Sequence, residues 1–80
     1  MVNAPDAPVL VDLRGLKCPI PALKTRKALQ STPPGGRIRV ECTDPLAVID
    51  IPHLLNTTGD VLEEQNRADG IIVFVIRKAG

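Results

Sequence analysis

Residues 15–21, with the sequence GLKCPIP, contain the side chain best suited to chemistry, a cysteine directly ahead of a proline. A cysteine thiolate is a nucleophile, and its pKa falls when the sulfur lies at the positive end of a helix or beside cations. The residues after Cys18 favour helix, so the sulfur is expected at such an end. The pattern is typical of a reactive thiol, although a cysteine that only packs at a helix start would also produce it.

The helix is expected over residues 19–30, because two prolines and two glycines follow it in residues 31–36. Proline is tolerated in the first helical turn, where its missing N–H would be unpaired anyway. We therefore expect Cys18 at the N-cap, Pro19 at the first helical position and Pro21 at the third. The two prolines are expected to position the sulfur more than to support the fold.

Positive charge and open backbone donors are expected around the sulfur. The N–H groups of Ile20 and Ala22 are expected to meet an anion that approaches this end of the helix. Lys17 and Lys24 add cations nearby. Together these groups are expected to lower the pKa of the Cys18 thiol.

The same helix carries an apolar pair outside its core-facing arc. Ala22, Thr25 and Leu29 are expected to face the sheet. Ile20 and Leu23 fall on a different arc and are expected to be exposed. An exposed apolar pair beside a reactive sulfur suggests a docking patch for a partner protein.

Chemistry that uses a single sulfur fits the rest of the chain. Cys18 has no second cysteine within three residues, which argues against a dithiol cycle. Cys42 alternates with apolar residues and is expected in the core. His53 is the one histidine, so a Cys–His pair requires the fold to bring it to Cys18, and these residues show no metal-site spacing. Carrying a persulfide and sensing an oxidant remain open.

The composition bounds the class of protein. The 80 residues are 44% apolar and 24% charged, as in one small globular domain; we expect a flexible tail at residues 1–8 and the domain at residues 9–80. The net charge is +1 and Trp and Tyr are absent, which argues against nucleic acid as a direct partner. The apolar runs are too short for a membrane helix and the N-terminus lacks signal-peptide order, so we expect a cytoplasmic protein. We also expect a monomer.

The order of the expected elements predicts the fold. Strands are expected at residues 9–13, 37–43, 60–67 and 70–78, and helices at residues 19–30 and 44–58. The Asp-Gly pair at residues 69–70 predicts a hairpin between the last two strands. This βαβαββ order favours an α+β fold, a two-layer α/β sandwich in which two helices cover one face of a four-stranded mixed sheet. The first two strands are expected to be parallel.

Two structural details stay open at this level. The second helix is expected to begin with Asp44 as its N-cap, but Pro52 either kinks the helix or makes it restart with Asp50 as a second cap. Residues 71–76, with the sequence IIVFVI, are apolar on both faces of a strand. Either a partner surface or long side chains on neighbouring strands would explain that strip.

Three segments resemble the TusA/SirA/YedF family of small sulfur-carrier proteins. These are DLRGLKCPIPALKTRKAL at residues 12–29, DPLAVIDIP at residues 44–52 and GIIVFVIRK at residues 70–78. The resemblance extends over residues 9–78. It implies a two-layer α/β sandwich like the C-terminal domain of a bacterial translation initiation factor.

The resemblance also implies an activity. The motif cysteine of the family, matched by Cys18, accepts sulfur as a persulfide from a cysteine desulfurase or a rhodanese-type donor and passes it to an acceptor protein. Gly15 and Leu16 match the start of the motif. Asp44 matches an acidic residue near the docking surface, although Asp44 and Asp50 are also explained as helix caps. Neither a cofactor nor a metal is implied.

The pathway is left open by this resemblance. Family members serve tRNA thiolation, sulfur oxidation or cofactor synthesis. Ile49 stands where relatives carry a charged residue, and Asp60 stands where the tRNA-thiolation member has histidine. Outside sulfur transfer, the alternative is a non-catalytic regulatory module that binds RNA or protein through the same fold.

Overall fold

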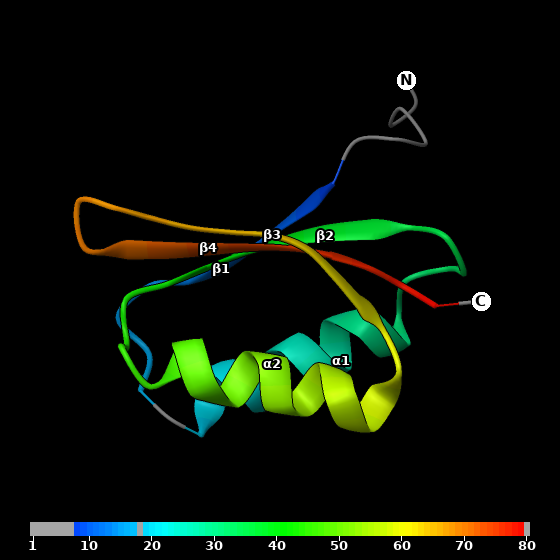
Figure 1. The fold of residues 1–80 in the computed structure, drawn as a ribbon, viewed down its shortest axis with the longest axis horizontal. Coiled ribbons are helices and arrows are strands. Elements are labelled where there is room, and N and C mark those ends of the chain that lie inside the picture. The colour runs from blue at the N-terminus through cyan, green and yellow to red at the C-terminus, as the bar shows by residue number, and fades with distance from the viewer. Residues whose placement is uncertain (1–7, 18, 80) are drawn as a thin grey trace.

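The computed structural model describes residues 8–17 and 19–79, in which the elements follow the order βαβαββ. They are β1 (Val9–Leu13), α1 (Ile20–Gln30), β2 (Arg37–Cys42), α2 (Ala47–Thr58), β3 (Val61–Ala68) and β4 (Ile71–Arg77). The sheet has the order β1-β2-β4-β3, with β1 parallel to β2 and the other neighbours antiparallel. Both helices cover the same face of the sheet, which confirms the predicted two-layer α+β sandwich (Figure 1). Neither of these helices is long and apolar enough to cross a membrane.

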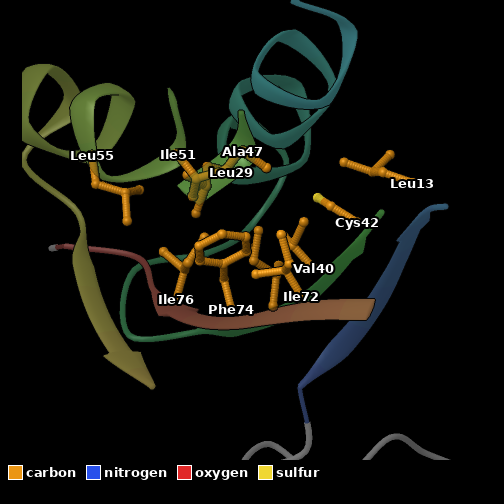
Figure 2. Packing of buried hydrophobic residues seen from close by; sticks show 11 residues of the cluster. Leu13, Leu29, Val40, Cys42, Ala47, Ile51, Leu55, Ile72, Phe74 and Ile76 are labelled. Atoms are coloured by element: carbon orange, nitrogen blue, oxygen red, sulfur yellow. The ribbon is translucent and has the colours of Figure 1, made fainter. Parts of the chain in front are cut away.

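Strict alternation along β2 builds the core between the sheet and the helices. Ile38, Val40 and Cys42 are buried, while the residues between them face the other side of the sheet. In register, Val40 lies between Val11 of β1 and Phe74 of β4. The side chains of Val40, Cys42 and Phe74 point from the sheet toward the helices (Figure 2). The core is therefore one apolar layer beneath α1 and α2.

The buried arc of α1 consists of Pro21, Thr25 and Leu29. Ala22, which the sequence predicted in place of Pro21, is only half-buried. Residues four apart stack on one face of a helix, so Thr25 and Leu29 bring Pro21 against the core. Pro21 thus packs in the fold, a role that the sequence alone did not indicate.

The chain enters α2 through a turn capped by Asp44. Oδ1 of Asp44 accepts the N–H of Leu46 at 3.0 Å. The carbonyl of Asp44 accepts the N–H of Ala47 at 3.0 Å. Asp44 therefore makes the predicted kind of capping contact, but two residues early, because the N-cap of α2 itself is Leu46.

Helix α2 is continuous, which excludes the second of the two alternatives, a restart at Asp50. Pro52 lies inside this helix, where its missing N–H removes one backbone hydrogen bond. Ile51 and Leu55, on either side of Pro52, are buried against the sheet. Their burial outweighs the local cost of the proline and keeps the helix intact through this position.

The β3–β4 hairpin turns at Asp69 and Gly70. Their φ angles are +53° and +77°, and two successive left-handed residues define a type I′ turn. This turn matches the right-handed twist of the flanking strands. The hairpin predicted from the Asp-Gly pair is confirmed.

The outer strand β3 is irregular at its start. Its pairing with β4 shifts register between Leu62 and Glu64, which leaves Glu63 as an extra residue. The carboxylate of Glu63 pairs with two guanidinium groups, with its oxygens 2.6 Å from Nε of Arg37 and 3.1 Å from Nε of Arg77. The bulge thus places one acidic group between two arginines that stand opposite each other on β2 and β4.

On the second apolar face of β4, Val75 is covered by neighbouring strands, whereas Ile71 and Val73 are half-buried. Val75 is 9% exposed although it points away from both helices. It pairs in register with Arg39 of β2 and with Glu64 of β3. The long side chains of those residues stand on the same face, and their stems account for the burial without a partner protein.

A buried hydroxyl in the core provides a test of these packing assignments. Thr25 is fully buried, and its Oγ1 has no hydrogen-bond partner among the described residues. We expect Thr25→Val to stabilise the fold by about 1 kcal/mol, because valine keeps the shape and removes an unpaired polar atom. Urea denaturation measures the change. Thr32→Val is the matched control, since Oγ1 of Thr32 donates to the carbonyl of Ala28 at 2.8 Å, and it should not stabilise. Destabilisation by Thr25→Val would contradict the assignment.

Candidate functional site

The loop that leads from β1 toward Cys18 is fixed at two points. The N–H of Leu16 donates to the carbonyl of Leu13 at 3.2 Å and closes a turn after β1. The N–H of Gly15 donates to Oγ1 of Thr43 at 2.9 Å, which joins this loop to the one that follows β2. Gly15 has φ +83°, a left-handed conformation that glycine adopts without strain. The chain ahead of the cysteine is therefore held in place by both neighbouring elements.

Cys18 itself lies outside the described residues, and its neighbours define the site. The N–H of Ile20 donates to the carbonyl of Lys17 at 2.9 Å, so one hydrogen bond joins the residues on the two sides of the Cys-Pro pair. The carbonyl of Pro19 accepts the first helical bond of α1, from the N–H of Leu23 at 3.1 Å. Pro19 is consequently the N-cap, a position that the sequence assigned to Cys18. The prediction that the Ile20 N–H faces an incoming anion is also wrong, because this N–H is already hydrogen-bonded to the carbonyl of Lys17.

Electrostatics at the start of α1 still favour an anion. The first turn of α1 contains no acidic side chain. Lys17 and Lys24, on either side of this turn, are exposed. A helix N-terminus flanked by lysines stabilises a thiolate relative to a thiol. The arrangement can therefore support a nucleophilic cysteine, with fewer backbone donors than the sequence predicted.

An open hollow of about 550 Å³ lies where the loops after β1 and β2 meet. Gly15, Leu16 and Lys17 line it from the first loop, and Asp44 and Leu46 line it from the second. The structure thus brings Asp44 next to Gly15, Leu16 and Lys17, candidate residues that lie in two separate segments of the sequence. Asp44 is half-buried here, and its bond to the N–H of Leu46 is sufficient to explain its position.

A second depression runs between α1 and α2 and includes Pro19, the residue after Cys18. Asp50 and His53 line it from α2. Asp50 is half-buried and His53 is exposed. The fold therefore places His53 on the same groove as Pro19, the residue that follows Cys18 in the chain.

Four exposed apolar side chains, which we call the apolar rim, lie at the starts of the two helices. Ile20 and Leu23 are 42% and 58% exposed, and Leu46 and Ile49 are 51% and 67% exposed. Because β1 and β2 are parallel, α1 and α2 both begin at the same end of the molecule (Figure 1). The exposure of the first pair confirms the sequence prediction. The second pair was missed, although the spacing of Leu46 and Ile49 sets them off the arc that contains Ile51.

Cys42 is the cysteine that the structure describes, and it is a core residue. Its side chain is fully buried, and it is a free thiol. Burial, with a smaller contribution from the negative charge of Asp44, raises the pKa of Cys42 to about 11. A thiol that stays protonated and inaccessible is a poor nucleophile. The sequence prediction that Cys42 is a core residue is confirmed.

Comparisons with known proteins identify the family of this chain. A family model described as sulfurtransferase TusA matches residues 9–78. The sulfur carrier protein TusA of Pseudomonas aeruginosa is 35% identical over 78 residues, which cover 98% of this chain and 96% of that protein. The sulfur carrier protein TusA of Pseudomonas putida is 35% identical over 74 residues, which cover 92% of this chain and 90% of that protein.

A solved structure supports the architecture. The crystal structure of a SirA-like protein from Desulfitobacterium hafniense superposes with a TM-score of 0.78 and covers 90% of this chain and 99% of that one. The two sequences are 23% identical, so this likeness concerns the fold. It agrees with the four-stranded mixed sheet and the two helices of the described residues.

The different environments of the two prolines lead to a matched prediction. Pro21 is buried in the second helical position, whereas Pro19 is exposed. We expect Pro21→Ala to destabilise the fold by about 1–2 kcal/mol, because buried ring carbons and a rigid backbone are lost. Pro19→Ala should change stability by less than about 0.5 kcal/mol. Thermal unfolding of both variants checks this, and equal melting temperatures would show that Pro21 contributes no packing.

Cys42 should make stability fall in alkali. Its pKa in the folded protein is above the ordinary value of 9.0, at about 11, so the unfolded chain releases this proton first as the pH rises. Stability should therefore decrease between about pH 9 and about pH 11, by at most about 3 kcal/mol from this group. Urea denaturation of the reduced protein at several pH values measures the slope. Cys42→Ala should have the shallower slope, and identical slopes would contradict the burial of this thiol.

Proposed function

Since the chain belongs to the TusA sulfurtransferase family, we propose that it is a sulfur carrier in which Cys18 holds the transferred sulfur. The observation that carries this proposal is the position of Cys18 in the chain, between a loop fixed to Thr43 and the exposed start of α1. Lys17 and Lys24 supply positive charge there. The other cysteine, Cys42, is buried and unsuited to the task.

The proposed reaction moves one sulfur atom between thiols without net oxidation. The Cys18 thiolate attacks the terminal sulfur of a donor persulfide, and a new S–S bond forms on Cys18. The S–S bond of the donor breaks, and the donor thiolate leaves with that electron pair. In the second half-reaction an acceptor thiolate attacks the terminal sulfur on Cys18 in the same way. The Cys18 thiolate then leaves, ready for another cycle.

The residues around Cys18 have distinct proposed roles. Gly15 and Leu16 position the loop, because the turn and the bond to Thr43 fix the backbone just ahead of the cysteine. Pro19 gives the cysteine a rigid C-terminal neighbour at the helix cap. By fixing the backbone on both sides of Cys18, these constraints would present the transferring group to a second protein in a defined orientation.

Transfer between proteins requires transient docking, and the apolar rim supplies a surface for it. Ile20 and Leu23 are exposed directly after the Cys-Pro pair. Exposed apolar side chains grouped at one end mark an interaction surface. Lys17 and Asp44 add charges beside Leu46 of the apolar rim. Such charges would orient a partner protein and raise its association rate. We propose a cysteine desulfurase or a rhodanese-type protein as the donor and a separate thiol protein as the acceptor, in the cytoplasm.

A labelling experiment tests the carrier role. The purified protein is incubated with a cysteine desulfurase and radioactive cysteine, and the chain is analysed with and without reductant. We expect label that reductant removes, because a persulfide is cleaved by thiols. Cys18→Ser should abolish the label and Cys42→Ala should retain it. Label that persists in Cys18→Ser would reject the assignment of the sulfur to Cys18.

Failure to take up sulfur from either donor class would favour the alternative, a non-catalytic interaction module with the same fold. This conclusion requires that a rhodanese loaded with thiosulfate is tested as well as the desulfurase, because the two donor classes present persulfides on different surfaces. Sulfenic acid on Cys18 under mild oxidant, without any sulfur uptake, would instead indicate a sensor thiol.

The reactivity of Cys18 provides a second test of the mechanism. Iodoacetamide alkylates thiolates, so the alkylation rate against pH follows ionisation of each cysteine. From about pH 6 to about pH 9 we expect Cys18 to be alkylated at least about ten-fold faster than Cys42, which is buried and protonated. Mass spectrometry of the digested protein follows the two sites. Equal, slow alkylation would mean that Cys18 is packed away from solvent.

A further inference from the structure

Strand β1 forms an outer edge of the sheet. In the strand order β1-β2-β4-β3, β1 has β2 as its one neighbour among residues 8–17 and 19–79. An edge strand presents a row of backbone N–H and C=O groups that can pair with an additional strand. The backbone of β1 is therefore available for pairing on its outer side.

The two edges of the sheet differ in their protection. The β3 edge carries a bulge near Glu63 and is rich in charge, with Glu64 and Arg67 also exposed. Bulges and charges of this kind discourage pairing with another strand. Strand β1 is regular and has the sequence VLVDL, and its residues Val9 and Leu10 are each 58% exposed. The β1 edge has no bulge and carries one charged residue, Asp12, so it is less protected than the opposite edge.

An open groove of about 580 Å³ runs between β1 and α1. Its apolar floor is formed by Val11, Leu13, Leu16 and Ala28, and its basic wall by Lys24 and Lys27. An edge strand with a helix alongside is the geometry in which an extended peptide adds to a sheet and places alternate side chains in the groove. The groove and the unpaired edge thus belong to one surface.

The charges of the groove favour an acidic occupant. Lys24 and Lys27 are both exposed. Asp12 and Ser31 also line the groove, but both carboxylate oxygens of Asp12 accept bonds from the side chain of Arg14, at 2.8 and 2.9 Å. That pair largely neutralises the one acidic group, so the net field of the groove is positive.

We propose that an extended segment of a partner protein, with alternating acidic and apolar residues, adds as a strand to β1. Its apolar side chains would cover Val11 and Leu16, and its carboxylates would pair with Lys24 and Lys27. Antiparallel pairing with a second copy is disfavoured, because it would bring the lysines of two α1 helices together. Single-stranded RNA is disfavoured because the one aromatic side chain, Phe74, is buried.

This surface adjoins the proposed sulfur site. Leu16 lines both the groove and the hollow formed with the loop after β2. A strand bound along β1 would therefore run beside the loop of residues 15–17. Its recognition does not depend on sulfur transfer, so a binding measurement tests it separately from the proposed carrier role.

The experiment is a titration of the isotopically labelled full chain with acetyl-Glu-Val-Glu-Val-Glu-Val-amide, followed by NMR. We expect shifts of the backbone amides in β1 and along residues 24–31, with slower hydrogen exchange in β1. Lys27→Glu should weaken binding at least about three-fold, because it replaces attraction by repulsion. Arg26→Glu is the matched control, since Arg26 faces the other groove, toward α2, and this reversal should weaken binding less than Lys27→Glu does.

Three further outcomes decide between the occupants. A peptide with N-methyl groups on the residues that face β1 keeps its charge but cannot complete the strand, so it should bind at least about ten-fold more weakly. Equal binding of that peptide, or of an oligouridylate of the same charge, would overturn strand addition in favour of simple anion binding. Sedimentation of the free protein should show one species at all concentrations. Concentration-dependent dimerisation that Lys27→Glu alters would assign β1 to a second copy instead.

Discussion

The parallel pairing of β1 with β2 is the constraint on which the candidate site depends. Parallel neighbours end at the same edge of the sheet, so the loops that leave them meet there. The bond between the Gly15 N–H and Thr43 Oγ1 joins those loops directly. The same pairing makes α1 and α2 begin side by side, which gathers two helix N-termini and the apolar rim at one end (Figure 1). An antiparallel arrangement of these strands would separate the cysteine loop from Asp44.

The two cysteines show how position in the fold divides one kind of side chain between two uses. Cys42 ends β2 on the core face, and burial raises its pKa to about 11. Cys18 follows a loop tied to the sheet and precedes the positive end of α1. A small carrier needs its second thiol to be unreactive, because a thiolate that attacked the inner sulfur of the Cys18 persulfide would form a disulfide and release the transferred sulfur as hydrogen sulfide. The core placement of Cys42 therefore protects the proposed chemistry as well as filling space.

Local patterns in the sequence predicted most of the fold and only part of the site. Alternation along β2 and the Asp-Gly hairpin predicted their elements because each depends on neighbouring residues alone. The start of α1 was misplaced by one residue, because Pro19 and Pro21 both suit an early helical position and the bond from Ile20 to Lys17 is not encoded in composition. The continuity of α2 through Pro52 could not be predicted, because it depends on burial against strands distant in the sequence.

The position of β4 in the sheet has a consequence for how the protein is made. Strand β4 is the last of the described elements along the chain, yet it lies between β2 and β3, and Phe74 and Ile76 stand at the centre of the core. During synthesis, β1, α1, β2 and α2 leave the ribosome before the strand that completes their apolar layer exists. The nascent chain must therefore remain unfolded, with its apolar residues exposed to chaperones and proteases, until the final strand emerges. Cooperative folding of the whole unit therefore has to wait until β4 is available to pair with β2 and β3.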